Sequence, residues 1–260
     1  MLACRFSTRQ GGAFLALLTL LSIGCTQLLG GKAEIRQNRL YLIEAEPIRS
    51  FLDGSERPYP QVVEIETFNV ARAYNRNEII FRRNELEIQL DKGHTWAVRP
   101  ADMITDAATQ YLKDATLFTL VGRDFIEQEA DYVLSGTVKI IERYDSGDIW
   151  FARLAISMRL VRRSDSRVVW RNDFDEERQV YNADMTFTIQ ALRDILRRQM
   201  EKAIREIDLT FLNQKRQQEG RPLLKLSALV NGRSQESRND TSGTSDEPLL
   251  YELIPGKMAQ

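Results

Sequence analysis

The sequence is poor in cysteine and histidine, and this shortage limits the chemistry open to the chain. Its two cysteines, Cys4 and Cys25, both lie near the amino terminus, and His94 is the only histidine. No disulfide can therefore form within a domain that follows them. The cysteine and histidine ligands of a usual zinc site are missing, and so are the paired cysteine and histidine that a cysteine protease needs. A turn explains His94 better than a catalytic base, because no nucleophile and orienting acid are positioned near it. We therefore expect no metal, no other cofactor and no enzymatic activity.

An excess of charge of either sign is also missing. The 36 lysines and arginines nearly cancel the 37 aspartates and glutamates. No global field draws such a chain towards nucleic acid, so we expect no nucleic-acid partner. Gly122 and Gly136 stand alone and no GxxxxGK[ST] loop occurs, so the chain cannot itself be an ATP-hydrolysing subunit.

The apolar run near the amino terminus is too short for a membrane span. It covers residues 13–23 and follows Arg5 and Arg9. A helix of that length would cross roughly half of the ~30 Å hydrocarbon core. A cationic head before a short apolar run is typical of a secretory signal peptide.

The run ends in the sequence Leu-Ser-Ile-Gly-Cys, which resembles the lipobox of bacterial lipoproteins. In that motif cleavage follows the small residue, here Gly24, and Cys25 receives acyl chains such as palmitate. Ser22 stands where leucine is commoner. The alternative is an ordinary signal peptide, but a lone thiol is a liability in an oxidising compartment and lipidation removes it. By the sorting rule of such lipoproteins, Thr26 in place of aspartate implies the outer membrane.

Composition divides the chain into four parts. We expect a signal peptide over residues 1–24, the lipidated cysteine and a flexible tether over 25–39, a folded domain over 40–213, and a polar, disordered tail over 214–260. The apolar stretch around Tyr251 in the tail is either a short docking peptide or a casual apolar end.

The folded part combines alternating and helical apolar patterns. Alternation and β-branched residues predict strands at 40–46, 62–68, 78–83, 86–90, 132–140, 150–160 and 168–174. Helical spacing predicts one helix from Pro100 to Ala115 and another over Leu192–Phe211. The result is an α+β, two-layer sandwich of a mostly antiparallel sheet with both helices on one face. We expect three tryptophans to pack in its core: Trp96, Trp150 and Trp170.

Arginines on the outer sheet face are candidate partner-binding residues. By alternation, Arg153 and Arg159 point away from the apolar face of strand 150–160. Three neighbours could extend them into a basic patch: Arg162, Arg163 and Arg171. A solvated face of mixed charge is the simpler explanation. Tyr251 of the tail is the third candidate contact.

Several short motifs resemble those of the ABC-type transport auxiliary lipoprotein family, to which PqiC-like outer-membrane lipoproteins belong. The motifs are dispersed over residues 41–212, and no single one is diagnostic. They are Tyr41-Leu42, Tyr59-Pro60, Trp96-Ala97 before Pro100, and the run Asp-Tyr-Val-Leu at 131–134.

The resemblance implies a lipoprotein on the periplasmic face of the outer membrane, acting as an adaptor in an envelope ABC/MCE-type transport system for phospholipid or another lipid. The implied partners are a periplasmic mammalian-cell-entry (MCE) domain protein and inner-membrane transport components. The resemblance is also compatible with assembly of the chain into a homo-oligomer. The alternative function is a structural or assembly lipoprotein that supports an outer-membrane barrel or binds the cell wall.

The lipid anchor can be tested at Cys25. Replacing it (Cys25→Ser) removes the only acceptor for a thioether-linked lipid in the mature chain, so membrane association and acyl labelling are both expected to be lost. Cell fractionation and metabolic labelling measure the two effects. Unchanged fractionation of the variant would contradict the lipoprotein hypothesis.

Overall fold

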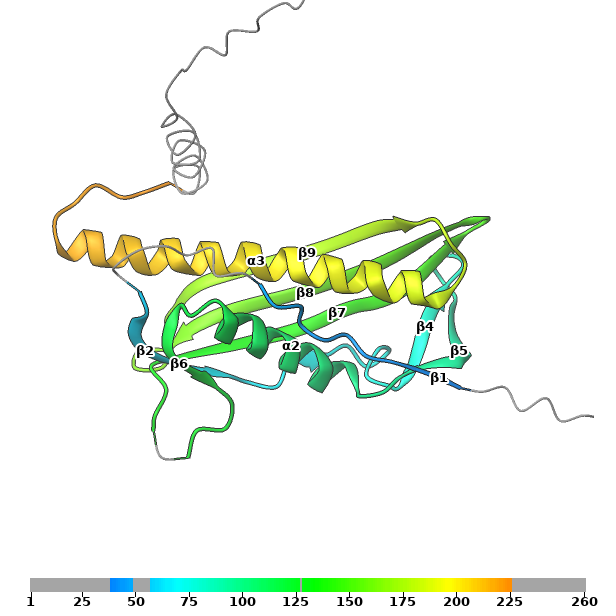
Figure 1. Ribbon diagram of the computed structural model, residues 1–260, viewed down its shortest axis with the longest axis horizontal. Helices are drawn as coiled ribbons and strands as arrows, with labels where there is room; N and C mark the ends of the chain where they lie inside the picture. Colours follow the sequence, from blue (N-terminus) through cyan, green and yellow to red (C-terminus); the bar gives the residue numbers. More distant parts are fainter. Residues whose placement is uncertain (1–37, 49–56, 127, 226–260) are drawn as a thin grey trace, which may run out of the picture. The chain divides into compact units, whose positions relative to one another are not determined.

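The computed structural model describes residues 38–48, 57–126 and 128–225 of the chain (Figure 1). From Arg39 onward the described residues belong to one compact unit. In this part of the chain, nine strands form a single mixed sheet, and two helices accompany it.

The strands differ widely in length, and three long ones carry the sheet. In chain order they are β1 (Arg39–Tyr41), β2 (Tyr59–Ile65), β3 (Asn69–Val70), β4 (Glu78–Arg82), β5 (Ile88–Trp96), β6 (Phe118–Gly122), β7 (Tyr132–Ser146), β8 (Ile149–Arg162) and β9 (Val168–Val180). β7 pairs antiparallel with β8 along its whole length, and β8 pairs antiparallel with β9. Along its other edge β7 pairs in parallel with β2, β3 and β4. The sheet continues from β2 to β6 and from β4 through β5 to β1.

The β7–β8 hairpin forms because both strands alternate apolar and polar side chains. Leu134 and Val138 of β7 and Ile156 and Leu160 of β8 are at most 1% exposed. Successive side chains of a strand point to opposite faces, so these four line one apolar face. Gly147 in the connecting turn has φ +62°, a conformation that glycine adopts without steric cost.

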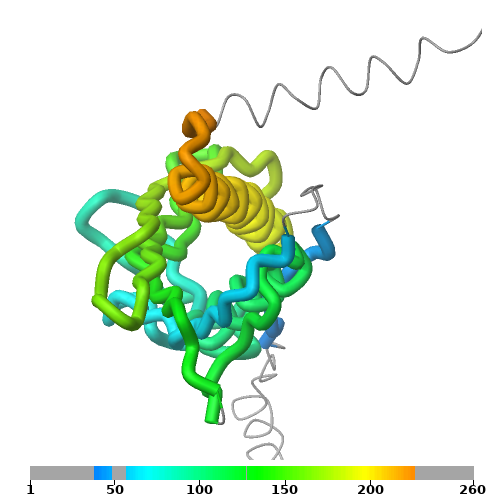
Figure 2. The backbone as a smooth tube through the Cα atoms, turned by 90° about the vertical axis from the view of Figure 1, so that its left-hand side faces the viewer, coloured from blue at the N-terminus to red at the C-terminus, as the bar shows by residue number. Residues whose placement is uncertain are grey.

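Two helices, α2 (Pro100–Asp114) and α3 (Met185–Gln218), cover that apolar face (Figure 2). Proline fits the first turn of α2, where its missing N–H is harmless. α3 begins after Asp184, whose carboxylate accepts a hydrogen bond from the Thr186 N–H at 2.8 Å. The buried residues of both helices and of the sheet form one continuous core.

A buried carboxylate on β7 joins the sheet to the loop before β4. Glu142 is 1% exposed and accepts hydrogen bonds from the Tyr74 hydroxyl at 2.5 Å and from Arg82 Nε at 3.1 Å. Burial, and then the hydrogen bond to Glu142, raises the pKa of Tyr74 to about 12. The Arg82 guanidinium supplies the positive charge that a buried carboxylate needs.

The α+β architecture predicted from the sequence is confirmed, with the two helices on one face of an open sheet. Antiparallel pairing joins the three longest strands, and most of the shorter strands pair in parallel, so the sheet is mixed. Trp96 and Trp170 are buried as expected, at 2% and 7% exposed, and Trp150 is half-buried against the core.

His94 lies in a strand, so its predicted place in a turn is wrong. The hairpin predicted over 78–83 and 86–90 is present, but β5 begins at Ile88 and continues to Trp96. β1 pairs in parallel with the end of β5, with Arg39 opposite His94. A strand whose partner lies far away in the sequence leaves little local signal.

Several other predicted elements differ from the structure at their ends; β7 and β9, for example, continue past residues 140 and 174. The strand predicted over 40–46 ends at Tyr41, because the residues after it leave the sheet. The helix predicted over Leu192–Phe211 runs from Met185 to Gln218, so the boundary predicted after residue 213 falls inside α3. β6 was not predicted, because its buried and exposed residues do not alternate.

The core packing can be tested at Gly136 of β7. A Cβ at this position would lie 2.4 Å from Phe68 Cε2, and Phe68 is itself buried. Gly136→Ala is therefore expected to destabilise the fold by about 1–3 kcal/mol through overpacking. Urea unfolding measures the shift of the midpoint.

The control is Gly93→Ala in β5, whose added Cβ meets nothing closer than Asp91 Oδ1 at 3.6 Å. Equal stability losses in the two variants would show that strand glycine in general, and not contact with Phe68, sets the cost.

Candidate partner-binding surfaces

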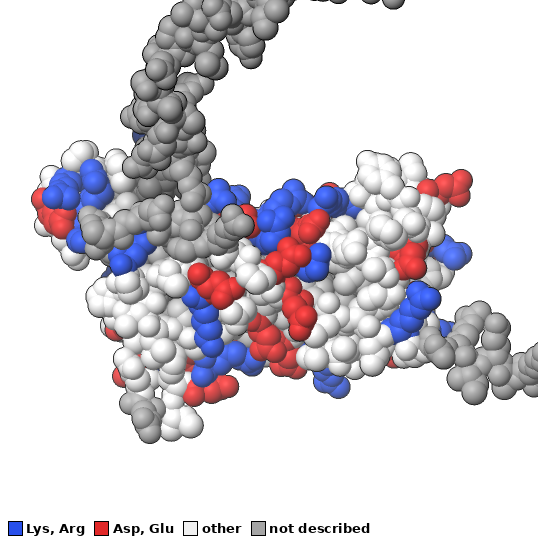
Figure 3. All heavy atoms as spheres, in the orientation of Figure 1, with Lys and Arg blue, Asp and Glu red and all other residues white. Residues whose placement is uncertain are grey.

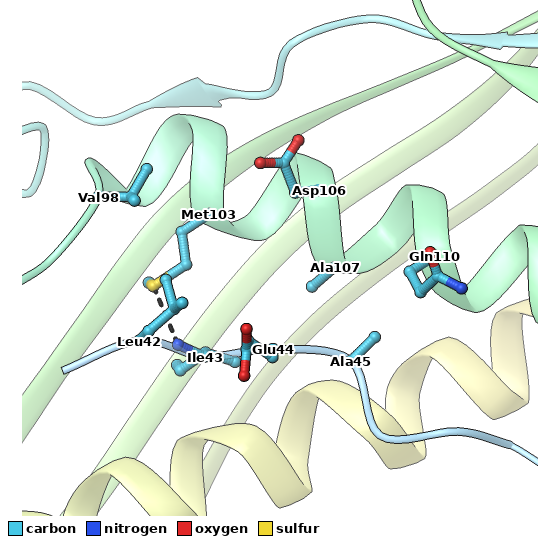
Figure 4. Close-up of a pocket in the computed structure, with 9 residues that line it drawn as sticks. All are labelled: Leu42, Ile43, Glu44, Ala45, Val98, Met103, Asp106, Ala107 and Gln110. Carbon is cyan, nitrogen blue, oxygen red and sulfur yellow. Dashed lines mark hydrogen bonds between the residues drawn. The ribbon is translucent and has the colours of Figure 1, made fainter.

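The segment after β1, residues 42–48, lies between the two helices (Figure 4). The Ile43 N–H donates to Met103 Sδ of α2 at 3.3 Å. The Glu46 N–H donates to the Tyr111 hydroxyl of the same helix at 3.3 Å. We call residues 42–48 the N-terminal segment.

Apolar burial holds the N-terminal segment more firmly than charge does. Glu46 forms ion pairs with Arg193 at 2.9 Å and Arg197 at 3.4 Å, both on α3. These side chains are 34–40% exposed, and exposed pairs typically contribute about 0–1 kcal/mol. Ile43, by contrast, is only 2% exposed, and burying such a side chain contributes roughly 1.5–3 kcal/mol.

A hollow of about 510 Å³ opens between the N-terminal segment and the first half of α2. We call it the groove. Its lining residues are Leu42, Ile43, Glu44, Ala45, Val98, Met103, Asp106, Ala107 and Gln110 (Figure 4). Leu42 and Val98 remain 43% and 38% exposed at its rim. Its size and apolar lining suit a small apolar group, such as a partner's side chain.

Charge is confined to the rim of the groove. Asp106 pairs with Arg123 at 2.7 Å, and Glu44 is exposed. Along the side of the molecule where α3 lies, Figure 3 shows cationic and anionic side chains intermixed, with an uncharged area beside them. In the described residues, no group of three or more histidines, cysteines, aspartates or glutamates could hold a metal ion.

The structure places Arg153 and Arg159 on the outer face of β8, but it does not bring them together. Six residues of an extended strand separate them by roughly 20 Å. Arg153 holds Asp175 through two hydrogen bonds, from Nε at 2.9 Å and from Nη2 at 2.7 Å. Arg159 donates to the Ser135 hydroxyl at 3.0 Å. In the described part of the chain it has no carboxylate partner.

The other arginines of the expected basic patch are neutralised. Each forms an ion pair; the pairs are Arg162–Asp165, Arg163–Glu64 and Arg171–Asp173. The outer face therefore carries a network of mixed charge. Asp173 and Asp175 of β9 were the partners that sequence reasoning missed, although Asp175 lies diagonally across from Arg153 and Asp173 lies two residues from Arg171 on the same strand.

His94 makes local contacts in β5. Its Nδ1 lies 2.8 Å from Asp91 Oδ2, and its ring lies 5.7 Å from that of Tyr41. The groove was not predicted, because its two walls come from residues that are far apart in the sequence.

Three residues singled out in the sequence lie outside the described residues: Gly24, Cys25 and Tyr251. The described helices include none that is long and apolar enough to cross a membrane.

Comparison with known proteins gives one family and several similar folds. Residues 41–203 match the sequence model of a family described as the ABC-type transport auxiliary lipoprotein component. The crystal structure of protein XCC0632 from Xanthomonas campestris is 17% identical, with a TM-score of 0.55 over 76% of this chain and 99% of that chain. A second solved structure, of an uncharacterized protein, is 10% identical, with a TM-score of 0.53 over 66% of this chain and 99% of that one. No curated protein sequence matches significantly.

The pairing of Arg153 with Asp175 makes a prediction about pH. The hydrogen bonds from Arg153 lower the pKa of Asp175 below its usual value. Their contribution to stability is present above the unfolded pKa of about 3.9 and is lost as the pH falls through the lower folded value. Arg153→Met is expected to return the pKa of Asp175 towards its ordinary value. Carboxyl carbon NMR titration measures this.

Arg159→Met is the matched control, because Arg159 makes no contact with Asp175. It should leave the titration of Asp175 unchanged. A shift of equal size in both variants would mean that the general charge of the face, and not the Arg153 pair, sets the pKa.

Proposed function

The chain belongs to the ABC-type transport auxiliary lipoprotein family, and we propose that it is the lipid-anchored accessory subunit of an envelope ABC/MCE-type lipid transport system. In this proposal it acts as an adaptor on the periplasmic face of the outer membrane. Its partners are a periplasmic MCE-domain protein and the inner-membrane components. The family is not an enzyme class, so ATP hydrolysis is the task of another subunit.

The proposed anchor is an acylated Cys25, released from the signal peptide by cleavage after Gly24. Each buried methylene of such a chain contributes ~0.8 kcal/mol to membrane binding. Arg39, where β1 begins, is the fourteenth residue after Cys25. An extended tether of that length reaches at most about 50 Å. The proposal therefore keeps the folded domain within this distance of the bilayer.

The start of the folded domain is well suited to carry a tether. β1 is hydrogen-bonded to β5, and the next residues are held between the helices by the buried side chain of Ile43. The family match begins at residue 41. The N-terminal segment therefore belongs to the family's domain, and it forms one wall of the groove.

The groove lies directly beside the start of the folded domain, where the proposed tether ends, and this observation supports the adaptor proposal. We assign the groove as the contact for an apolar side chain of the MCE-domain partner, because Leu42 and Val98 are exposed at its rim. Arg159 on the sheet face and Tyr251 in the tail are further proposed contacts. The proposed tail, which can begin only after α3 ends at Gln218, would extend the reach of the adaptor.

The adaptor role can be tested by site-specific crosslinking in cells. A photo-crosslinking amino acid at Val98 is expected to give a covalent adduct with an MCE-domain protein, identified by mass spectrometry. The control position is Leu120 on β6, which has the same exposed fraction, 38%, and lies outside the groove. It should give no such adduct.

The same experiment separates the alternative function. An adduct with an outer-membrane β-barrel protein or with peptidoglycan would favour a structural or assembly lipoprotein. Failure to recover any envelope transport component from Val98 would overturn the adaptor proposal.

A further inference from the structure

Exposed apolar side chains gather where the β4–β5 and β7–β8 hairpins turn. Five of them define a surface that we call the apolar tip: Leu86, Ile88, Leu90, Ile149 and Tyr181. Leu86 is 97% exposed and Tyr181 86%, and the other three are 39–44% exposed. Large apolar side chains exposed together usually mark an interaction site.

The strand register places the two hairpins next to each other. Arg82 of β4 pairs both with Ile88 of β5 and with Tyr144 near the end of β7. Tyr144 in turn faces Phe151 of β8. Neighbouring strands lie about 4.8 Å apart, so Ile88 is roughly 15 Å from Phe151.

Tyr181 belongs to the same surface because of the pairing of β9. Val180, the last residue of β9, lies opposite Trp150 of β8. The next residue along β9 therefore reaches the level of Ile149, which begins β8. The apolar tip thus lies at one end of the sheet, where β4, β7 and β9 end and β5 and β8 begin.

Leu86, Ile88 and Leu90 repeat with the period of a strand. Side chains two residues apart on a strand share a face, so Ile88 and Leu90 form one apolar stripe at the start of β5, and Leu86 lies in the turn just before it. The outer face elsewhere, on β8 and β9, carries paired charges. Because the stripe is apolar where the rest of the outer face is charged, we infer that an apolar partner or phase contacts it in the cell.

Aromatic and cationic side chains border the tip in the way that a bilayer interface favours. The rings of Tyr144 and Phe151 lie 6.2 Å apart beneath it. The guanidinium of Arg83 lies 5.8 Å from the centre of the Phe81 ring. Tyrosine and arginine place an apolar body beside lipid chains while the polar end stays in water.

The tether enters the domain near Tyr181 of the tip, at a point six residues along β5 from Ile88. Arg39, the first residue of β1, forms an ion pair at 3.5 Å with Asp184, which lies three residues after Tyr181. In the proposed function the other end of the tether carries lipid at Cys25, so the bilayer is the apolar phase closest to the tip.

We propose that the apolar tip inserts into the bilayer interface, so that the domain rests on the membrane through a second contact besides the lipid on Cys25. The inference rests on the proposed lipid anchor. Because α3 begins beside the tip and its 34 residues span about 50 Å, the end of α3 then faces away from the bilayer. The proposed tail would start at that distant end.

The test uses full-length, lipidated protein in vesicles of phosphatidylethanolamine and phosphatidylglycerol with brominated acyl chains, which quench tryptophan fluorescence. Leu86→Trp places a reporter at the tip. Val168→Trp is the matched control, because Val168 is 48% exposed at the opposite end of the β8–β9 pair. After the wild-type signal of Trp96, Trp150 and Trp170 is subtracted, the Leu86→Trp reporter is expected to be quenched at least about twofold more than the control.

A second variant checks the cause. Ile88→Asp, combined with Leu86→Trp, is expected to abolish the extra quenching, because a charge on the stripe opposes insertion. Circular dichroism confirms that the variant is folded.

Acyl labelling of Cys25 on the same samples separates the two proposals. A labelled protein with equal quenching at both reporters overturns the membrane contact and leaves the anchor standing. An unlabelled protein overturns the anchor and, with it, the membrane contact. A reporter at Leu86 that is shielded by a second copy or by another protein, without bromine quenching, also overturns the proposal.

Discussion

The structure depends on covering one apolar face of the β7–β8–β9 ladder. The three strands are long, and alternate side chains of β7 and β8 are mostly buried on that face, as are Trp170, Asn172 and Val180 of β9. Exposure of this apolar face to water is unfavourable, and one helix is too narrow to cover all of it. α3 therefore lies along the face, and α2 covers the part nearest β3 and β6. The gap that remains between the helices is closed by the N-terminal segment through Ile43.

That arrangement links the proposed membrane anchor to the core. The chain enters through β1, which lengthens the sheet, and then passes between the helices that cover it. Force on the tether would therefore act on hydrogen bonds of the sheet and on a buried isoleucine rather than on a loose loop. The same segment forms a wall of the groove, so anchor and proposed partner contact share a few residues.

Local patterns were reliable where a single element carries the signal. The alternation of β8 and the apolar stripe of α3 predicted both elements, and Pro100 marked the first residue of α2. They were unreliable for His94 and for β6, whose strands exist because distant segments pair with them. The candidate arginines show the same limit: their positions on the outer face followed from alternation, but the aspartate that neutralises Arg153 comes from another strand.

The sequence by itself determined the fold class, the family resemblance and the expectation of a lipid on Cys25, because each rests on local patterns: one motif for the lipid, and a series of short motifs and apolar periods for the family and the fold. Only the tertiary structure decided where the charges are paired and where the surface is hollow or apolar. The groove joins residues 42–45 to α2, and the apolar tip joins two hairpins and the end of β9. Such surfaces arise from strand register and from packing between distant segments, and no local period of the sequence encodes them.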